Sequence, residues 1–256
     1  MQLRHEGKVA LCAGSATGMG AETAHRLALE GAKVIVGDVQ LQSAQQLIER
    51  IKADGGEAHA LEFDIASEES VRGLVARTVE RFGRLDLMHV NATDRKLNRQ
   101  DYDVVSTDLA VFDRMHTVSL RGHLLCSRFA IPEMLKGGGG AIVYTSSDAG
   151  KTAAPSRMSY YIAKAGLNGL MRHVAVRWGR EGIRANSICP GIILTDAVMI
   201  NTSEAERDEM RARIPSRRLG KVQDIAALVS FLLSDEEAGW INGQAVSVDG
   251  GSVTHG

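Results

Sequence analysis

The sequence predicts an α/β fold in which a doubly wound parallel sheet of about seven strands carries helices on both faces. Short apolar runs rich in β-branched residues alternate with longer helical runs from one end of the chain to the other. Such alternation is typical of sheets built from strand–helix–strand units. No repeat, low-complexity tract or linker interrupts it. We therefore expect a single domain over residues 1–256.

The expected strands are short apolar runs, and the expected helices fill the intervals between them. The strands are Lys8–Ala13, Lys33–Asp38, Glu57–Phe63, Leu85–Asn91, Ala141–Thr145, Ile183–Ile188 and Gln244–Val248. After a helix that ends at Leu29, the further helices are Leu41–Lys52, Ser67–Phe82, Asp108–Lys136, Arg157–Gly179 and Val222–Leu233. Ser67 is a helix-capping residue type, and the glycines Gly137–Gly140 end the longest helix.

Residues 194–218 break this regular alternation. The segment is charged, and apolar residues such as Met199 and Met210 are scattered through it. Two interpretations stay open here, a lid over a substrate site or a solvated connection.

Composition excludes several classes of function. Apolar residues make up 44% and charged residues 24% of the 256, which is ordinary for a globular protein. The net charge of −1 favours neither nucleic acid nor an anionic membrane as a partner. No apolar stretch approaches the roughly 20 residues that span a bilayer.

The cysteines and the N-terminal residues favour a reducing compartment. Cys12, Cys126 and Cys189 are odd in number and lie in apolar stretches, so we expect buried free thiols. No cysteine and histidine spacing resembles a metal site, and we expect no metal. The first residues lack the apolar core of a signal peptide. We therefore expect a cytoplasmic protein.

A glycine-rich turn follows the first strand and opens the first helix. It reads Gly14-Ser15-Ala16-Thr17-Gly18-Met19-Gly20. Glycines let the backbone approach a pyrophosphate, and the helix N-terminus offers N–H donors to it. Asp38 ends the second strand, where a carboxylate can accept a hydrogen bond from a ribose 2′-hydroxyl and repels a 2′-phosphate. Because Val39 follows it and no arginine is near, we expect NAD rather than NADP.

Tyr160 and Lys164 are four residues apart, so they share one face of an expected helix. An ammonium beside a phenol favours the phenolate, which is the device needed to move a proton at an alcohol oxygen near neutral pH. Tyr161 has Ala165 at the corresponding position and lacks such a partner.

Together these features resemble the short-chain dehydrogenase/reductase family, whose fold is a Rossmann-like parallel sheet. Ser147 precedes Tyr160 by the family's spacing, and the C-terminal run Val248-Asp249-Gly250-Gly251 is similar to a family signature. The resemblance implies that Ser147, Tyr160 and Lys164 are catalytic. It implies cofactor contacts from the glycine turn (Gly14, Ser15, Thr17, Gly18, Met19, Gly20), from Asp38, Val39, Asp64, Ile65, Asn91, Ala92, Tyr160 and Lys164, and from Pro190, Gly191, Ile193 and Thr195.

Two segments depart from the family pattern. The family's Asn-Asn-Ala-Gly is Val90-Asn91-Ala92-Thr93 here. The family's active-site asparagine, which holds a water beside the lysine, aligns with Ser119. A serine hydroxyl can also hold a water, with a different reach, so Ser119 is included among the catalytic residues.

The resemblance implies an NAD-dependent enzyme that interconverts a secondary alcohol and its ketone. The alternative is a dinucleotide-binding sensor or scaffold of the same fold that has lost turnover, for which Ser119 is the support. The candidate substrate contacts are Thr93, Asp148, Arg157 and Met199. For Asp148, capping a turn is an equally open role. The resemblance also implies a homotetramer that packs through the helices at 108–136 and 157–179.

Overall fold

The computed structural model describes residues 3–254 and confirms the predicted parallel sheet. Its strand order is β3-β2-β1-β4-β5-β6-β9, and every neighbouring pair is parallel. The strands are β1 (Val9–Ala13), β2 (Lys33–Asp38), β3 (Glu57–Glu62), β4 (Leu87–Val90), β5 (Gly140–Thr145), β6 (Ile183–Pro190) and β9 (Ala245–Val248).

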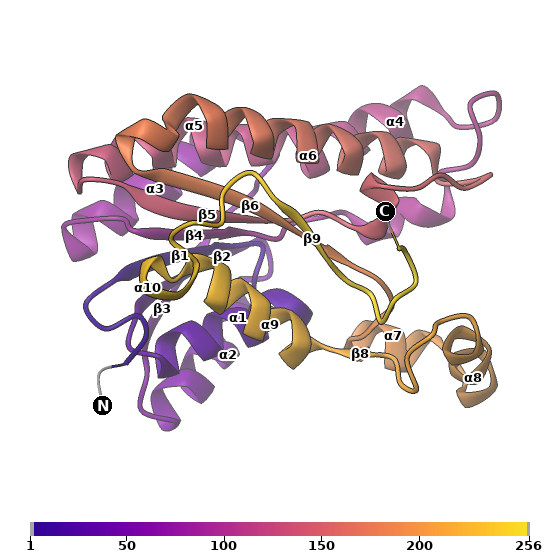
Figure 1. Cartoon of the computed structure of the whole chain (residues 1–256), viewed down its shortest axis with the longest axis horizontal. Coiled ribbons are helices and arrows are strands. Elements are labelled where there is room, and N and C mark those ends of the chain that lie inside the picture. The colour runs from indigo at the N-terminus through magenta and orange to yellow at the C-terminus, as the bar shows by residue number, and fades with distance from the viewer. Residues whose placement is uncertain (1–2, 255–256) are drawn as a thin grey trace.

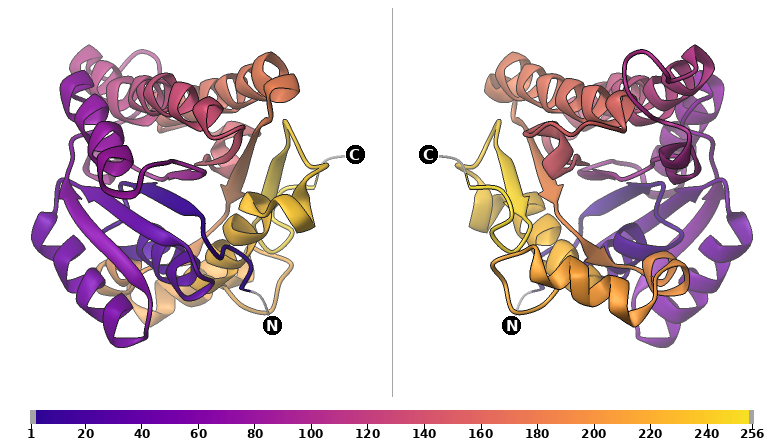
Figure 2. Two further views of the ribbon diagram at one scale, coloured as in Figure 1. Left: turned by 90° about the vertical axis from the view of Figure 1, so that its left-hand side faces the viewer. Right: turned by 90° about the vertical axis from the view of Figure 1, so that its right-hand side faces the viewer.

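Helices cover both faces of this sheet, so the molecule has three layers (Figure 1). The end views show the sheet twisting between the two helical layers (Figure 2). One layer holds α3 (Glu68–Phe82), α4 (Leu109–His116), α5 (Gly122–Lys136) and α6 (Met158–Trp178). The other holds α1 (Gly18–Leu29), α2 (Leu41–Ala53), α9 (Val222–Leu233) and α10 (Asp235–Ala238).

The strands are apolar throughout because both of their faces are buried. On β1, Leu11 and Ala13 pack into the core on the α3–α5–α6 side. Ala10 and Cys12 alternate with them and pack on the α1–α2–α9 side. Side chains of successive strand residues point to opposite faces, so a strand covered on both sides needs a continuous apolar run.

The chain order creates a topological switch point at the carboxyl end of the sheet. From β1 the chain moves outward to β2 and β3, then returns to place β4 on the other side of β1. At such a switch point the connections after the two central strands diverge, and ligands of open α/β sheets bind there, beyond the carboxyl ends of the strands.

The longest expected helix is a composite of three parts. Between α4 and α5, Thr117–Arg121 forms a π-helical turn, labelled η2, with Ser119 at its centre. The backbone angles at His116, Thr117 and Arg121 are those of a right-handed helix, so the three parts follow one another without a break. The π turn places one extra residue in this part of the helix, a distortion that is frequent at functional sites.

Several boundaries also differ from the expected ones by one or two residues. The helix expected from Arg157 begins at Met158, since Arg157 has a left-handed backbone with φ of 62°. Strand β6 continues through Pro190, two residues further than expected.

The irregular segment is an excursion between two very short strands. β7 (Ile193–Leu194) and β8 (Gly220–Lys221) pair in parallel, and the chain between them contains α7 (Asp196–Asn201) and α8 (Glu204–Ala212). Figure 1 shows both helices at the end of the molecule to which β9 points. Within residues 3–254, none of the helices combines the length and apolar character needed to cross a bilayer.

Candidate active site

The glycine turn packs directly against the connection that follows β4. A Cβ atom built on Gly14, whose φ is +73°, would lie 2.4 Å from the Cβ of Ala92. One built on Gly20 would lie 2.6 Å from the Ser15 hydroxyl oxygen and 2.8 Å from the Asn91 amide nitrogen. The Asn91 amide donates a hydrogen bond to the Gly14 carbonyl at 2.9 Å. Only glycine fits at these positions, and their expected roles in the turn are compatible with this geometry.

This turn offers polar groups that suit the pyrophosphate of a dinucleotide. Helix α1 begins at Gly18, and its N-cap residue Thr17 makes no side-chain capping bond. The Ser15 hydroxyl oxygen and the Asn91 carbonyl oxygen are buried without a hydrogen-bond partner among the described residues. A helix N-terminus behind a glycine-rich turn is a ready anion site. The residues present therefore fit such a group.

Asp38 is held beside the turn. Its carboxylate is buried and accepts hydrogen bonds from the backbone N–H groups of Ala16 and Gln40, both at 2.9 Å. Val39, next to it, is largely exposed. The carboxylate thus has a fixed position at the carboxyl end of β2.

Asp64 and Ile65 follow β3 at the same edge. The Asp64 carboxylate accepts from the backbone N–H of Ala66, while Ile65 is buried against Gly122 of α5. The Ile65 side chain belongs to the core, so any contact with a ligand falls to its backbone.

Ser147, Tyr160 and Lys164 meet where β5 ends and α6 begins. Ser147 directly precedes the short helix η3 (Asp148–Gly150), and it acts as a side-chain hydrogen-bond partner of Tyr160. The Lys164 side chain is buried, and its Nζ lies 5.7 Å from the centre of the Tyr160 ring. The three expected catalytic side chains are therefore brought together.

The charge state of this group differs from the expectation. Burial raises the pKa of Tyr160. The hydrogen bond with Ser147 and the charges of Arg157 and Arg95 lower it, but they offset the effect of burial only in part. Lys164 Nζ donates its hydrogen bond to the Thr145 carbonyl at 2.8 Å, away from the phenol. Burial also lowers the pKa of Lys164 to about 8. In the protein without a bound cofactor, burial therefore outweighs the groups that lower the Tyr160 pKa.

The side chains of Ser119 and Thr93 are in contact with each other. Their hydroxyl oxygens are 3.3 Å apart, and the Ser119 hydroxyl also donates to the sulfur of Met115 at 3.4 Å. Ser119 is fully buried in the π turn. Two of the positions where the sequence departs from the family pattern, Thr93 and Ser119, are therefore direct neighbours.

The connection after β6 closes the glycine turn from the other side. A Cβ built on Gly18 would lie 3.4 Å from the Thr195 side chain, so the turn and this connection touch. Thr195 is buried, and its hydroxyl accepts from the Val198 N–H to cap α7. Ile193 is buried in β7, whereas Met199 on α7 is about half exposed.

Asp148 lies between this connection and Ser147. Its Oδ2 would be 3.1 Å from a Cβ on Gly191, and its Oδ1 is buried without a hydrogen-bond partner. Burial, reinforced by Asp249, raises the pKa of Asp148 to about 6, while Lys151 opposes the shift. The Asp148 carboxyl is therefore a half-buried group with capacity for a further hydrogen bond.

Two charged groups near Tyr160 were not expected from the sequence. Arg95 begins the short helix η1 (Arg95–Arg99), and Asp101 is a buried carboxylate close to the start of α6. Both lie in the polar stretch after β4, where the sequence shows many charged residues and nothing to single out two of them.

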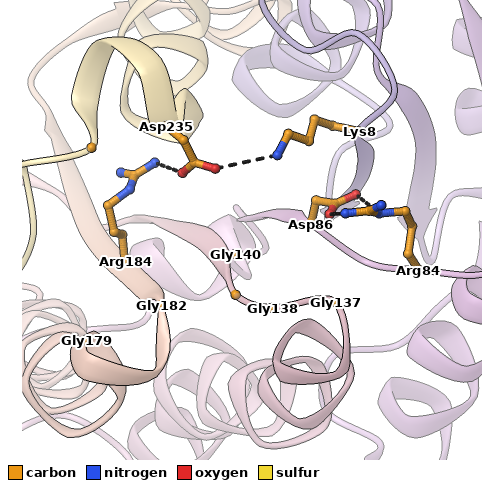
Figure 3. Close-up of a pocket in the computed structure, with 12 residues that line it drawn as sticks. Lys8, Arg84, Asp86, Gly137, Gly138, Gly140, Gly179, Gly182, Arg184 and Asp235 are labelled. Atoms are coloured by element: carbon orange, nitrogen blue, oxygen red, sulfur yellow. Dashed lines mark hydrogen bonds and ion pairs between the residues drawn. The ribbon is translucent and has the colours of Figure 1, made fainter.

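A second hollow, of about 350 Å³, lies at the opposite edge of the sheet (Figure 3). Its charges pair with one another: Arg84 with Asp86, and both Lys8 and Arg184 with Asp235. Arg184 also donates to the carbonyls of Leu232 and Leu233 at the end of α9. We assign these charges a structural role.

The fold and the site define a dinucleotide-binding oxidoreductase. The family model described as enoyl-(acyl carrier protein) reductase matches residues 13–253. A 7alpha-hydroxysteroid dehydrogenase of Bacteroides fragilis is 33% identical over 252 residues, covering 98% of this chain and 96% of the relative. A cyclohexanol dehydrogenase of an Acinetobacter species is 34% identical over 250 residues, with the same two coverages.

A solved structure is similar over the whole chain. It is a 7alpha-hydroxysteroid dehydrogenase complexed with NADH and 7-oxo glycochenodeoxycholic acid, with a TM-score of 0.91 and 33% identity, covering 99% of this chain and 97% of that one. The chain belongs to the short-chain dehydrogenase/reductase family.

The Asp148 carboxyl provides a pH-dependent test of this geometry. Its pKa is 3.8 in the unfolded reference and about 6 in the fold, so the folded state binds the proton more tightly and stability falls as pH rises through that window. Asp148→Asn should therefore be more stable than the parent above that window by on the order of 1 kcal/mol. Below it the gain should vanish. Urea unfolding on both sides of the window measures this, and a gain independent of pH would contradict it.

Proposed function

We propose that this protein is an NAD-dependent oxidoreductase that interconverts a secondary alcohol and its ketone by hydride transfer. The observation that carries the proposal is the convergence of Ser147, Tyr160 and buried Lys164 at the same sheet edge as the glycine turn. Proton-transfer groups and a dinucleotide cradle then face one crevice, which is what the oxidation of an alcohol requires.

Each of the three side chains has a distinct task in this proposal. Tyr160 takes the alcohol proton during oxidation and returns it to the ketone oxygen during reduction. Ser147 donates a hydrogen bond to that oxygen and holds it beside the phenol. Lys164 places a positive charge under the Tyr160 ring, since a pKa of about 8 leaves it mostly protonated near neutral pH. The bound dinucleotide supplies the hydride chemistry.

The position of Asp38 supports NAD as the cofactor. Backbone N–H groups hold its carboxylate at the end of β2, where a ribose 2′-hydroxyl could donate to it. A 2′-phosphate placed there would meet a buried negative charge. Val39 adds no positive charge to offset that repulsion.

The substrate class is proposed from the walls of the crevice and from the relatives. We propose Thr93, Asp148, Arg157 and Met199 as substrate contacts. Asp148 follows Ser147 directly, the charge of Arg157 lowers the pKa of Tyr160, Thr93 contacts Ser119, and Met199 lies on the excursion over residues 194–218 that we propose as a lid. The relatives named for hydroxysteroids and cyclohexanol act on ring alcohols according to those names. Cyclic secondary alcohols are therefore the first compounds to assay. The free, buried cysteines suit the reducing cytoplasm that we propose as the compartment.

We also propose a homotetramer that packs through α4, α5 and α6. These helices expose the apolar side chains of Leu109, Leu124, Ile162 and Val176. Apolar side chains spaced along neighbouring helices are typical of faces covered by a partner. Light scattering on the purified chain should give four copies, and a monomer would contradict the proposal.

Replacing the proposed acid–base group tests the function directly. Tyr160→Phe should lower turnover of cyclic alcohols with NAD by roughly a hundredfold or more, because general acid–base catalysis is lost. NAD affinity should change little, since the glycine turn is untouched. Tyr161→Phe is the matched control and should keep most of the activity.

The same assay separates the enzyme from the sensor alternative. Tight NAD binding without turnover of any alcohol or ketone in the panel would favour the sensor. Equal activity of the Tyr160→Phe and Tyr161→Phe variants would remove Tyr160 from the proposed role.

Cofactor preference is tested by a double substitution at the end of β2. Asp38→Ala with Val39→Arg removes the buried carboxylate and adds a cation for a 2′-phosphate. The ratio of kcat/KM for NADP over NAD should rise by about tenfold or more, equivalent to about 1.4 kcal/mol. An unchanged ratio would place Asp38 outside the ribose site.

A further inference from the structure

The helix that carries Tyr160 and Lys164 begins without a capping side chain of its own. Its N-cap residue is Arg157, which offers no acceptor and has a left-handed backbone, the only non-glycine φ above zero among residues 3–254. The first N–H groups of a helix need acceptors from outside the helix. In most helices the N-cap side chain accepts from the second or third helical residue, which here are Ser159 and Tyr160.

Asp101 supplies the missing acceptors from a distant part of the chain. Its Oδ1 accepts from the Ser159 N–H at 3.0 Å, and its Oδ2 accepts from the Tyr160 N–H at 2.9 Å. Asp101 is 2% exposed, and no ion pair to a described residue balances its charge. The positive end of the helix dipole is therefore the favourable charge that it meets.

Backbone carbonyls of the same segment extend this contact. The Arg157 N–H donates to the Asp101 carbonyl at 2.9 Å, and the Met158 N–H donates to the Tyr102 carbonyl at 3.1 Å. Four consecutive N–H groups, from Arg157 to Tyr160, are thus held by two consecutive residues. The strained backbone of Arg157 lies inside this contact, where the surrounding bonds can maintain it.

We propose that Asp101 is a positioning residue for the Tyr160 hydroxyl, acting through the first turn of α6. This inference rests on the proposed function for Tyr160. The segment that contains Asp101 also carries Thr93 and Arg95, so it ties the wall of the substrate crevice to the proton-transfer group. Asp101 has no contact with substrate or cofactor in this role.

Loss of the carboxylate should act on Tyr160 in a recognisable direction. The groups that face the phenol are Ser147, Arg157, Arg95, Tyr161 and Lys164, and Ser147 lowers the Tyr160 pKa by hydrogen bonding. If the phenol moves away from Ser147 while it stays buried, the pKa rises, because burial then acts without the opposing hydrogen bond. If Asp101 acted only through its negative charge, its removal would lower the pKa. The sign of the change therefore separates positioning from a field effect.

Two substitutions of Asp101 remove its hydrogen-bond acceptors to different extents. Asp101→Asn keeps one acceptor oxygen, and Asp101→Ala keeps none. In NAD-dependent oxidation of an alcohol found with the panel, kcat should fall by roughly tenfold for Asn and a hundredfold for Ala, the scale of a small misplacement of a catalytic group. KM for NAD should stay within about twofold, because the glycine turn is distant. If the Ala variant does not fold, the Asn variant carries the test.

The matched control is Asp103→Asn in the same segment. Asp103 is exposed, and among the described residues its carboxylate accepts only from its own neighbours Val105 and Ser106. Its substitution should leave kcat and the Tyr160 titration unchanged.

A phenol titration tests Asp101 without any substrate. The ultraviolet absorbance of each variant, minus that of its Tyr160→Phe counterpart, isolates the ionisation of Tyr160. The midpoint should move to higher pH in Asp101→Asn. A lower melting temperature with unchanged kcat and an unchanged titration midpoint would show that Asp101 is only a structural cap, and would overturn the proposal. A midpoint at lower pH would overturn it as well. Absence of turnover in the parent protein would defeat the proposed function alone, since the titration still reports on Asp101.

Discussion

The close approach of the Gly14 turn to the backbone at Ala92 is the constraint on which the site depends. It brings together the connections that leave β1 and β4, and the Asn91 amide joins them through the Gly14 carbonyl. The same turn is tied to β2, because Asp38 accepts from the Ala16 N–H. Three strand ends are thereby fixed to one another before any ligand is considered. The cradle is preorganised by these contacts, in which two fixed side chains, those of Asn91 and Asp38, bind the main chain of the turn.

The interior beneath Lys164 explains why its charge is costly. His89 and His123 are fully buried there, and burial lowers the pKa of His89 to about 3 and that of His123 well below its usual value. Both rings are therefore neutral near pH 7 and provide no negative charge. Lys164 is held mainly by the Thr145 carbonyl, a dipole rather than an ion. A cation in such surroundings loses its proton more readily than one in water.

Much of this architecture was predictable because its signals are local. Val34, Ile35 and Val36 indicate a strand by themselves, and the glycine turn and Asp38 show by spacing that a cradle follows. The i, i+4 spacing of Tyr160 and Lys164 gave their shared helix face. It could not give the carbonyl to which Lys164 donates, because Thr145 reaches that position only through the packing of β5 against α6.

Other features escaped prediction for the same reason. The π turn around Ser119 leaves right-handed backbone angles and apolar spacing nearly unchanged, so only the hydrogen-bond pattern reveals it. The strands β7 and β8 are two residues each, too short to produce a period. Asp101 lies 58 residues from Ser159, and no short-range rule joins a carboxylate to a helix that distant in the chain.

The pairing of β7 with β8 also affects which parts of the sequence can change among related proteins. Both ends of the intervening excursion are fixed by main-chain bonds, and the Ser216 N–H donates to Gly250 as a further tether. Lengthening a loop closed in this way costs only about 0.6 kcal/mol for each doubling. Insertions and substitutions between residues 195 and 219 can therefore accumulate while the sheet and its cradle stay intact. Evolution can therefore change the length and side chains of this excursion with little penalty to folding.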